Sequence, residues 1–178
     1  MADRLDACRR ADKWRSALVV GGASCAALTG TLLAPPAPVL LWNASPSSPV
    51  GLYWVRQGRT PALGGTAIAW PPPAARRLAA ARDYLPADVP LVKNVAGVAG
   101  TRICAVGAAV FVNGRVSAVR RVRDGAGRPL PWWSGCHTLS RGELFLLSTG
   151  APAAFDGRYF GITRAGELIG EGELLWPR

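Results

Sequence analysis

The stretch NASPSSPVGLY, residues 43–53, decides how the rest of this chain is interpreted. It sets three serines among two prolines, directly before an apolar run. Pro46 and Pro49 fix φ on either side of Ser47 and favour extended conformations in the residues before them. A serine held in such a segment presents its hydroxyl in one direction, as a nucleophile must. A plain proline-rich linker has the same appearance, so this stretch alone leaves both interpretations open.

The size and charge of the chain narrow the classes of function. Its 178 residues suit one modest domain, and 49% of them are hydrophobic, which is enough for a core. The net charge of +10 comes almost entirely from arginine, because lysine occurs only at positions 13 and 93. A basic excess is typical of proteins that bind nucleic acid or anionic lipid. No basic run follows the first segment and no DNA-binding motif is present, so we predict no nucleic-acid partner and a surface that suits a membrane.

The N-terminal region predicts a membrane anchor. Residues 1–15 are rich in arginine, and residues 16–34 carry no charge, close to the roughly 20 apolar residues of a bilayer-spanning helix. A cleaved signal peptide is an alternative, because small residues lie near position 34, and a buried soluble helix is another. The basic residues before the span predict that residues 1–15 are a cytoplasmic N-terminus and that residues 16–34 form a transmembrane anchor. Residues 35–178 would then form a periplasmic serine peptidase domain. The expected location is therefore the bacterial inner membrane, crossed once, with membrane lipid as a partner.

The exported part reads as mainly β, with a single helix. Turn residues and short apolar runs alternate along it without the strand–helix alternation of a parallel sheet. Asn113-Gly114 predicts a hairpin turn. The expected architecture is a twisted, partly closed β-sheet. The predicted strands lie in residues 66–70, 89–97, 116–122, 143–148 and 167–176, and the predicted helix in residues 74–84.

The cysteines of the exported part predict a disulfide bond. Cys104 and Cys136 would lie in an oxidising compartment, where they can pair and stabilise the fold by about 3–4 kcal/mol. Two reduced, buried cysteines are the alternative. The chain has no CxxC motif and a single histidine, His137, so we predict neither a metal site nor a cofactor. We interpret His137 as a surface or hydrogen-bonded residue and not as a catalytic base.

Lys93 is the candidate base, because it is the only lysine after residues 16–34. It interrupts an apolar run, and on a strand it would share a face with Leu91 and Val95. Burial lowers the pKa of a lysine, and a neutral amine can take the proton of a serine hydroxyl. An edge-strand lysine that protects the sheet against aggregation is the alternative.

Three segments together resemble one family, the TraF-type conjugative-transfer signal peptidases, which are related to type I signal peptidases. The residues 43–53 resemble the nucleophile box of that family. Residues 91–100, LVKNVAGVAG, resemble the lysine box, and residues 155–161, FDGRYFG, resemble the C-terminal box. The similarity covers nearly the whole chain, with the boxes in the expected order. It also includes an N-terminal anchor, paired cysteines and a GELFLL strand.

The resemblance implies roles for five residues. Ser47 matches the nucleophile and Lys93 the general base. Asp156 matches an acidic residue that supports the site, Ser45 would lie near the oxyanion, and Arg158 would pair with a carboxylate such as Asp156. The chain departs from the family at two positions. Thr101 replaces an aspartate that follows the lysine box, and Gly157 replaces a serine next to Asp156, whose hydroxyl is often found near the lysine.

The expected function is that of a membrane-anchored serine endopeptidase with a Ser-Lys dyad. Its expected substrate is a secreted or membrane-inserted precursor, implied by the resemblance to be a pilin-like protein of a conjugative or type IV secretion system, whose subunits would be further partners. The departures at positions 101 and 157 motivate an alternative, a non-catalytic assembly subunit with the same fold. A type I signal peptidase with broad substrates is the third hypothesis.

Overall fold

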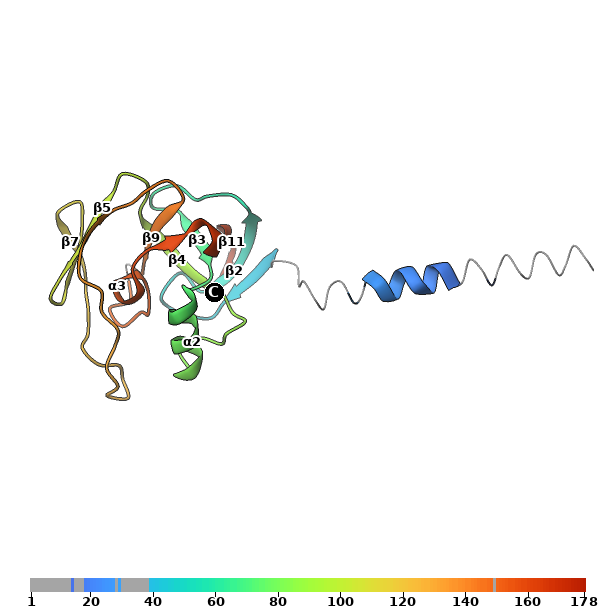
Figure 1. The fold of residues 1–178 in the computed structure, drawn as a ribbon, viewed down its shortest axis with the longest axis horizontal. Coiled ribbons are helices and arrows are strands. Elements are labelled where there is room, and N and C mark those ends of the chain that lie inside the picture. The colour runs from blue at the N-terminus through green and yellow to red at the C-terminus, as the bar shows by residue number, and fades with distance from the viewer. Residues whose placement is uncertain (1–13, 15–17, 28, 30–38, 149) are drawn as a thin grey trace, which may run out of the picture. The chain divides into compact units, whose positions relative to one another are not determined.

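A computed structural model of the chain describes residue 14, residues 18–27, residue 29, residues 39–148 and residues 150–178 (Figure 1). The chain divides into two compact units, Met1–Ala37 and Pro38–Arg178. In the first unit, residues 18–27 and residue 29 are helical. Among the described residues, no helix is long and apolar enough to cross a membrane. The remaining residues of the predicted anchor, 16–17, 28 and 30–34, lie outside the described residues, as does all but residue 14 of the predicted cytoplasmic segment.

The second unit is mainly β, as predicted, and its larger sheet has seven strands. Every neighbouring pair in this sheet is antiparallel, and β4 lies between β3 and β9 near one end of the order. In spatial order the strands are β1 (Leu40–Asn43), β2 (Gly51–Gln57), β11 (Leu168–Pro177), β3 (Thr66–Ala69), β4 (Leu91–Gly97), β9 (Glu143–Leu147) and β10 (Thr163–Arg164).

A smaller antiparallel sheet of four strands lies beside the larger one (Figure 1). The predicted turn at Asn113-Gly114 joins two of its strands, and both turn residues have positive φ, 48° and 79°. The apolar run 103–112 does not form one strand, because it turns back at Gly107, whose φ is 53°. In spatial order the strands are β7 (Arg115–Val119), β6 (Ala109–Val112), β5 (Arg102–Val106) and β8 (Gly135–Thr138).

The helices of this unit are short. Helix α2 (Pro73–Ala81) begins at a proline, which suits the first helical turn because its missing N–H would lack a helical partner there. The helix was predicted to reach residue 84, but it ends earlier, and Asp83 has a positive φ of 57°. Helix α3 (Gly157–Phe160) and the 3-10 helix η1 (Ala165–Glu167) follow in the C-terminal part.

The connection after β4 and a shared apolar core show how the chain divides between the two sheets. Residues 98–101 form a turn that carries the chain from β4 in the larger sheet to β5 in the smaller one. One apolar cluster then joins the sheets, because Ile103 and Val110 of the smaller sheet pack with Phe145 and Leu147 of β9. A second cluster, which includes Ala67, Val95 and Leu146, covers the opposite face of β9 and β4. Side chains alternate along a strand, so Lys93 shares the face of Val95.

Candidate active site

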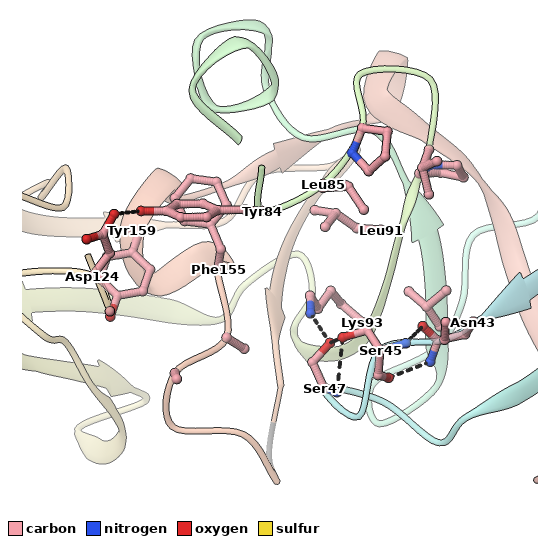
Figure 2. A pocket seen from close by; sticks show the side chains of 18 of the residues that line it. Asn43, Ser45, Ser47, Tyr84, Leu85, Leu91, Lys93, Asp124, Phe155 and Tyr159 are labelled. Carbon is pink, nitrogen blue, oxygen red and sulfur yellow. Dashed lines mark hydrogen bonds between the residues drawn. The ribbon is translucent and has the colours of Figure 1, made fainter. Parts of the chain in front are cut away.

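The structure brings the two predicted catalytic residues together. Ser47 lies in the loop between β1 and β2, and Lys93 lies in the middle of β4. The Nζ of Lys93 donates a hydrogen bond to the Oγ of Ser47 at 2.6 Å (Figure 2). This distance lies within the range over which a base takes a proton from a hydroxyl. An amine and a hydroxyl that are 46 residues apart in the chain therefore form one pair.

Burial changes the acid–base behaviour of Lys93. Its side chain is only 4% exposed, and its strand neighbour on β3 is Ala67, which has no polar group to offer. Loss of hydration lowers the pKa of the Lys93 amine to about 8, while the negative charge of Asp156 opposes this shift and the positive charge of Arg158 adds to it. At pH 7, about one molecule in ten thus carries a neutral amine beside Ser47.

The side chain of Asn43 organises the loop that carries Ser47. Asn43 is buried at the end of β1, and its Oδ1 accepts the backbone N–H of Ser45 at 3.1 Å. Its Nδ2 donates to the carbonyl oxygens of Ser45, Ser48 and Pro49 at 3.0–3.2 Å. Sequence reasoning assigned Asn43 no role. The sequence does contain a signal for this role, because Asn43 stands between an apolar segment and a Ser-Pro turn. At such a position an asparagine side chain readily forms hydrogen bonds to the nearby backbone.

Ser48 and Ser45 have different positions beside Ser47. The hydroxyl of Ser48 is buried and donates to the carbonyl of Val92 at 2.8 Å, which ties the loop to β4. Ser45 is exposed, and its Oγ donates to the Oγ of Ser47 at 2.9 Å and accepts the backbone N–H of Ser47 at 3.3 Å. The hydroxyl of Ser45 is therefore close to both the side chain and the amide of Ser47.

Asp156 and Arg158 form a buried ion pair behind Lys93. Asp156 is fully buried and caps α3, where one oxygen accepts the backbone N–H of Arg158 at 3.1 Å. The guanidinium of Arg158 contacts both carboxylate oxygens at 2.8 Å and 3.0 Å. Arg158 also donates to the carbonyls of Ser148 and Pro152, each at 3.0 Å. The pair therefore fixes the loop between β9 and α3.

Comparison with known proteins places this arrangement in a family. The sequence profile of the signal peptidases, peptidase S26, matches residues 13–176. The chain belongs to the signal peptidase S26 family. It is 32% identical to the plasmid transfer protein TraF of Escherichia coli over 164 residues, which cover 85% of this chain and 89% of that protein. It is 36% identical to the probable conjugal transfer protein TraF of Sinorhizobium fredii over 138 residues, 72% of each chain. The resemblance to TraF-type signal peptidases is thereby confirmed.

Among solved structures, a signal peptidase I from Enterococcus faecalis aligns with 64% of this chain and 97% of its own. The two are 16% identical in sequence, and their TM-score is 0.36.

Thr101 and Gly157, where the sequence departs from the boxes that it resembles, both have structural explanations. At position 101, the Oγ1 of Thr101 accepts the backbone N–H of Val98 at 3.1 Å, so the turn after β4 keeps a polar side-chain contact without an aspartate. At position 157, a Cβ on Gly157 would lie 2.7 Å from the carbonyl oxygen of Leu146 and 2.9 Å from the ring of Phe145. A serine does not fit there without a shift of the backbone, so glycine is what this packing requires.

The Ser47–Lys93 pair lies at one end of a cleft of about 520 Å³. Apolar side chains such as Leu85, Leu91 and Phe155 line its middle (Figure 2). At the other end, the hydroxyl of Tyr84 donates to a carboxylate oxygen of Asp124. A groove of this shape can hold an extended, largely apolar segment of chain with its backbone at the serine.

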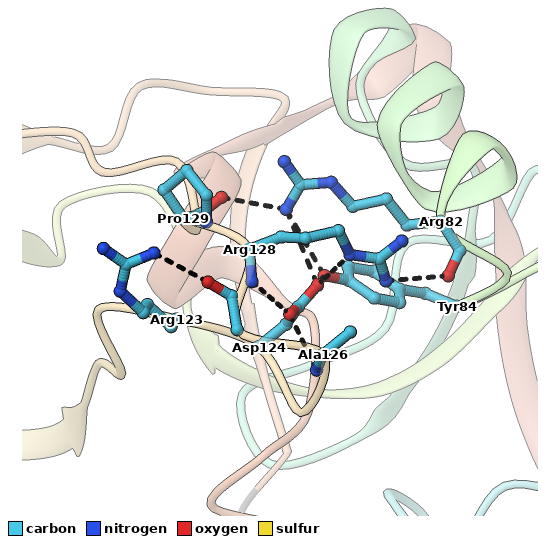
Figure 3. A network of polar contacts seen from close by, with 8 residues as sticks. Arg82, Tyr84, Arg123, Asp124, Ala126, Arg128 and Pro129 are labelled. Carbon is cyan, nitrogen blue, oxygen red and sulfur yellow. Dashed lines mark hydrogen bonds and ion pairs between the residues drawn. The ribbon is translucent and has the colours of Figure 1, made fainter.

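A network of polar contacts closes the far end of this cleft (Figure 3). Asp124 accepts from the Nε of Arg128 at 2.7 Å and lies 3.8 Å from Arg82, which follows α2. Hydrogen bonds from Tyr84 and Arg128 hold the pKa of Asp124 well below its usual range. The sequence predicted only a turn at Asp124-Gly125. Nothing in the local pattern indicates that Asp124 bonds to a tyrosine 40 residues earlier in the chain.

The remaining predicted residues lie away from the Ser47–Lys93 pair. Cys104 of β5 and Cys136 of β8 form a disulfide, as predicted. His137 is exposed, and its Nε2 lies 2.7 Å from a carboxylate oxygen of Glu143. The bond between Glu143 and His137 lowers the pKa of the Glu143 carboxyl. None of these residues lines the cleft.

Proposed function

We propose that this chain is a serine endopeptidase in which Ser47 is the nucleophile and Lys93 the general base. The observation that carries the proposal is the 2.6 Å hydrogen bond between Lys93 Nζ and Ser47 Oγ, with the amine buried and its pKa lowered to about 8. Membership of the signal peptidase family supports the same chemistry. A lysine with its ordinary pKa of about 10.4 would be protonated and unable to act as a base.

In the proposed mechanism, neutral Lys93 takes the proton of the Ser47 hydroxyl while Oγ attacks the scissile carbonyl carbon. The Lys93 ammonium then gives this proton to the leaving amine, the C–N bond breaks, and an acyl-enzyme forms on Ser47. Lys93, neutral again, takes a proton from water as the water attacks the ester. The collapse of the second tetrahedral intermediate returns the proton to Ser47 and releases the new carboxylate.

The oxyanion of each tetrahedral intermediate requires hydrogen-bond donors. The backbone N–H of Ser47 and the hydroxyl of Ser45 are adjacent to the nucleophile and can both turn toward such an oxygen. Asp156 and Arg158 act behind the lysine, where their charges set the potential at its amine. In this proposal they support the site and do not touch the substrate.

The proposed substrate is a secreted or membrane-inserted precursor, and specifically a pilin-like protein of a conjugative transfer system. The names of the two TraF relatives support a role in conjugation. The apolar lining of the cleft favours an extended, largely apolar segment of the substrate. In the proposed topology, residues 1–15 are cytoplasmic, residues 16–34 anchor the chain in the inner membrane, and the site acts on the periplasmic side. Subunits of the secretion apparatus would be its partners.

The test is cleavage of a candidate pilin precursor by the full chain in detergent micelles. The wild type should cleave, whereas Ser47→Ala and Lys93→Ala should lose at least 1000-fold in rate, because each removes a group that takes part in bond formation. Ser117→Ala is the matched control, since Ser117 is an exposed serine of β7 whose hydroxyl donates to the carbonyl of Arg115, and it does not line the cleft. Normal cleavage by either site variant would remove the proposed mechanism.

Covalent labelling locates the nucleophile independently of the natural substrate. A serine-directed acylating or phosphonylating inhibitor should add its mass to the peptide that contains Ser47. Labelling should fall strongly in Lys93→Ala and vanish in Ser47→Ala. A label on Ser48 in the wild type would assign the nucleophile to the neighbouring serine instead.

A further inference from the structure

Ser148 directly follows the last residue of β9, the strand adjacent to that of Lys93, and no sequence motif includes it. In the antiparallel pair of β4 and β9, Asn94 is opposite Leu147 and Val95 is opposite Leu146. One further residue in this register sets Ser148 opposite Lys93. Residues that face each other across antiparallel strands have Cβ atoms about 4.5–5.5 Å apart and point to the same side of the sheet. The Ser148 hydroxyl is therefore on the face that carries the Lys93 amine.

The backbone of Ser148 is firmly held by the buried ion pair. Its N–H donates to a carboxylate oxygen of Asp156 at 2.8 Å, and its carbonyl accepts from Arg158 at 3.0 Å. Asp156 and Arg158 are also the two charged groups whose fields reach the amine of Lys93. The same ion pair thus contacts Ser148 directly and acts on Lys93 through its charges. They involve only backbone atoms of Ser148, so a change of its side chain leaves them intact.

Among the residues that the structure describes, the side-chain hydroxyl of Ser148 has no hydrogen-bond partner, although the residue is only 3% exposed. A buried hydroxyl without a partner costs free energy, commonly about 1–3 kcal/mol, and such groups are rare unless they have a role. An alanine would fill the same space without this cost. The presence of a hydroxyl at this position therefore needs an explanation beyond packing.

The protonation of Lys93 offers an explanation for the hydroxyl of Ser148. A protonated lysine has three N–H donors, and within the described part of the chain Lys93 makes only the bond to Ser47. When Lys93 has taken a proton, the buried ammonium requires further acceptors. The oxygens of Asp156 are already engaged by the amide of Ser148 and by Arg158. The lone pairs of Ser148 Oγ are free.

We propose that Ser148 is a positioning residue whose Oγ accepts a hydrogen bond from the Lys93 ammonium and holds it after each proton transfer. This inference rests on the proposed function, in which Lys93 alternates between its two protonation states. Ser148 does not contact the substrate and acts only through Lys93. It keeps the amine directed at Ser47 while the Ser47 oxygen is acylated and no longer available as an acceptor.

The hydrogen bond to Ser148 stabilises the charged form of Lys93 more than the neutral form. Ser148→Ala should therefore lower the pKa of Lys93 by about one pH unit, which corresponds to a tenfold change in its protonation equilibrium. On the alkaline plateau, kcat for precursor cleavage should fall about tenfold with KM unchanged, because the amine is less well directed at Ser47, and the acidic limb of the pH–rate profile should move about one pH unit lower. Ser148→Thr keeps a hydroxyl and should keep the titration of the wild type.

The two lysines of the chain make this titration directly observable. Full-length protein with ¹³C at the lysine ε-carbons gives two signals, one from Lys13 and one from Lys93, and Lys93→Arg assigns them. Thr163→Val is the matched control, because Thr163 is another buried hydroxyl without a partner. It pairs with Leu144, four residues before Ser148 on β9, which is about 13 Å along the strand. It should leave the Lys93 signal unchanged.

An unchanged Lys93 titration in Ser148→Ala would overturn the inference, and so would an equal shift in Thr163→Val. The titration does not depend on activity, so the two proposals can fail separately. If the wild type cleaves no precursor but Ser148→Ala shifts the titration, the contact stands and the peptidase proposal fails. If the wild type cleaves and Ser148→Ala matches it in both pH profile and titration, only the role of Ser148 is lost.

Discussion

The Lys93 amine combines burial with contact to Ser47, and its titration should therefore control the reaction. Only the neutral amine can accept a proton, so the active fraction grows as the pH rises through the pKa of about 8. We predict that kcat/KM for a precursor peptide rises about tenfold per pH unit from pH 6 and levels off above pH 8. A profile that is flat between pH 6 and pH 8 would contradict a base with this pKa.

The same residue should make the fold less stable at neutral pH. The pKa of Lys93 falls from 10.5 in the unfolded chain to about 8 in the folded one. Burial of the charged Lys93 amine therefore lowers the free energy of unfolding by about 3 kcal/mol at pH values below 8. Between pH 8 and pH 10.5 the unfolded state binds more protons, so stability rises with pH and the penalty disappears. Lys93→Met should therefore be more stable than the wild type by about 2–3 kcal/mol at pH 7 and by almost nothing at pH 10.5, by chemical denaturation of the full chain. Lys13→Met is the control and should show no such difference.

At the scale of single elements, helix α3 tests the packing argument at position 157. A Cβ there would overlap the carbonyl of Leu146 and the ring of Phe145, which both belong to β9. Gly157→Ser should therefore destabilise the fold by about 1–3 kcal/mol, the usual cost of overpacking. Gly166→Ser is the control, because no atom lies within 4 Å of the Cβ site at Gly166. Equal midpoints of denaturation for the two variants would show that α3 can move away from β9 at little cost.

The edge strand β8 illustrates stabilisation of a different kind. All four of its residues are exposed, so β8 has little apolar burial and depends on its ladder with β5 and on the Cys104–Cys136 bond. The bond closes a loop of 32 residues, and its removal should cost about 3–4 kcal/mol. We predict this loss for the double variant Cys104→Ser, Cys136→Ser, together with faster amide exchange in β8.

The site lies on the other sheet, so the double variant should still be labelled at Ser47 by the inhibitor at 25 °C. Unchanged stability in the double variant, or loss of labelling in a sample that remains folded, would contradict this division of roles. Cys25→Ser is the matched control, since Cys25 is a free, exposed cysteine.

The elements also show what the sequence could and could not predict. Strands with apolar periodicity, such as β4 and β9, were predicted within two residues, because burial of one or both faces leaves a pattern. Strand β8 was missed, since the exposed sequence GCHT carries no such pattern and pairs only because β5 is beside it. Asn43 was quoted in the nucleophile box without a role, because its value lies in contacts that the loop creates on folding.

Strand register limited the prediction of the site in the same way. A lone lysine in an apolar run indicated a buried amine, and the structure agrees. The neighbours of Lys93 on β3 and β9 are set by the pairing of segments that are far apart in the chain. Ala67 and Ser148 could therefore not be named from the sequence.

At the scale of the whole second unit, the cleft depends on segments that come from both sheets. The segment after α2 leads into β4 of the larger sheet, and residues 121–125 follow the smaller sheet, yet both line the cleft with residues 153–159. The bond from Tyr84 to Asp124 joins the first two of these segments directly (Figure 3). The width of the cleft far from Ser47 is therefore set by a contact that has no part in the chemistry.

Removal of this contact should weaken binding without slowing bond cleavage. Tyr84→Phe keeps the ring that packs 5.3 Å from Phe155 and loses only the hydroxyl. We predict that KM for a long precursor peptide rises about three- to tenfold while kcat stays within a factor of two, because a looser cleft costs ordering free energy on binding. Amide exchange in residues 123–129 should become faster. Ser117→Ala is the control, since Ser117 is exposed and does not line the cleft. A contact that only joins distant segments acts on substrate binding and on opening of the cleft, and not on the proton transfer at Lys93. A fall in kcat with KM and amide exchange unchanged would therefore contradict this role and assign Tyr84 to the reacting groups.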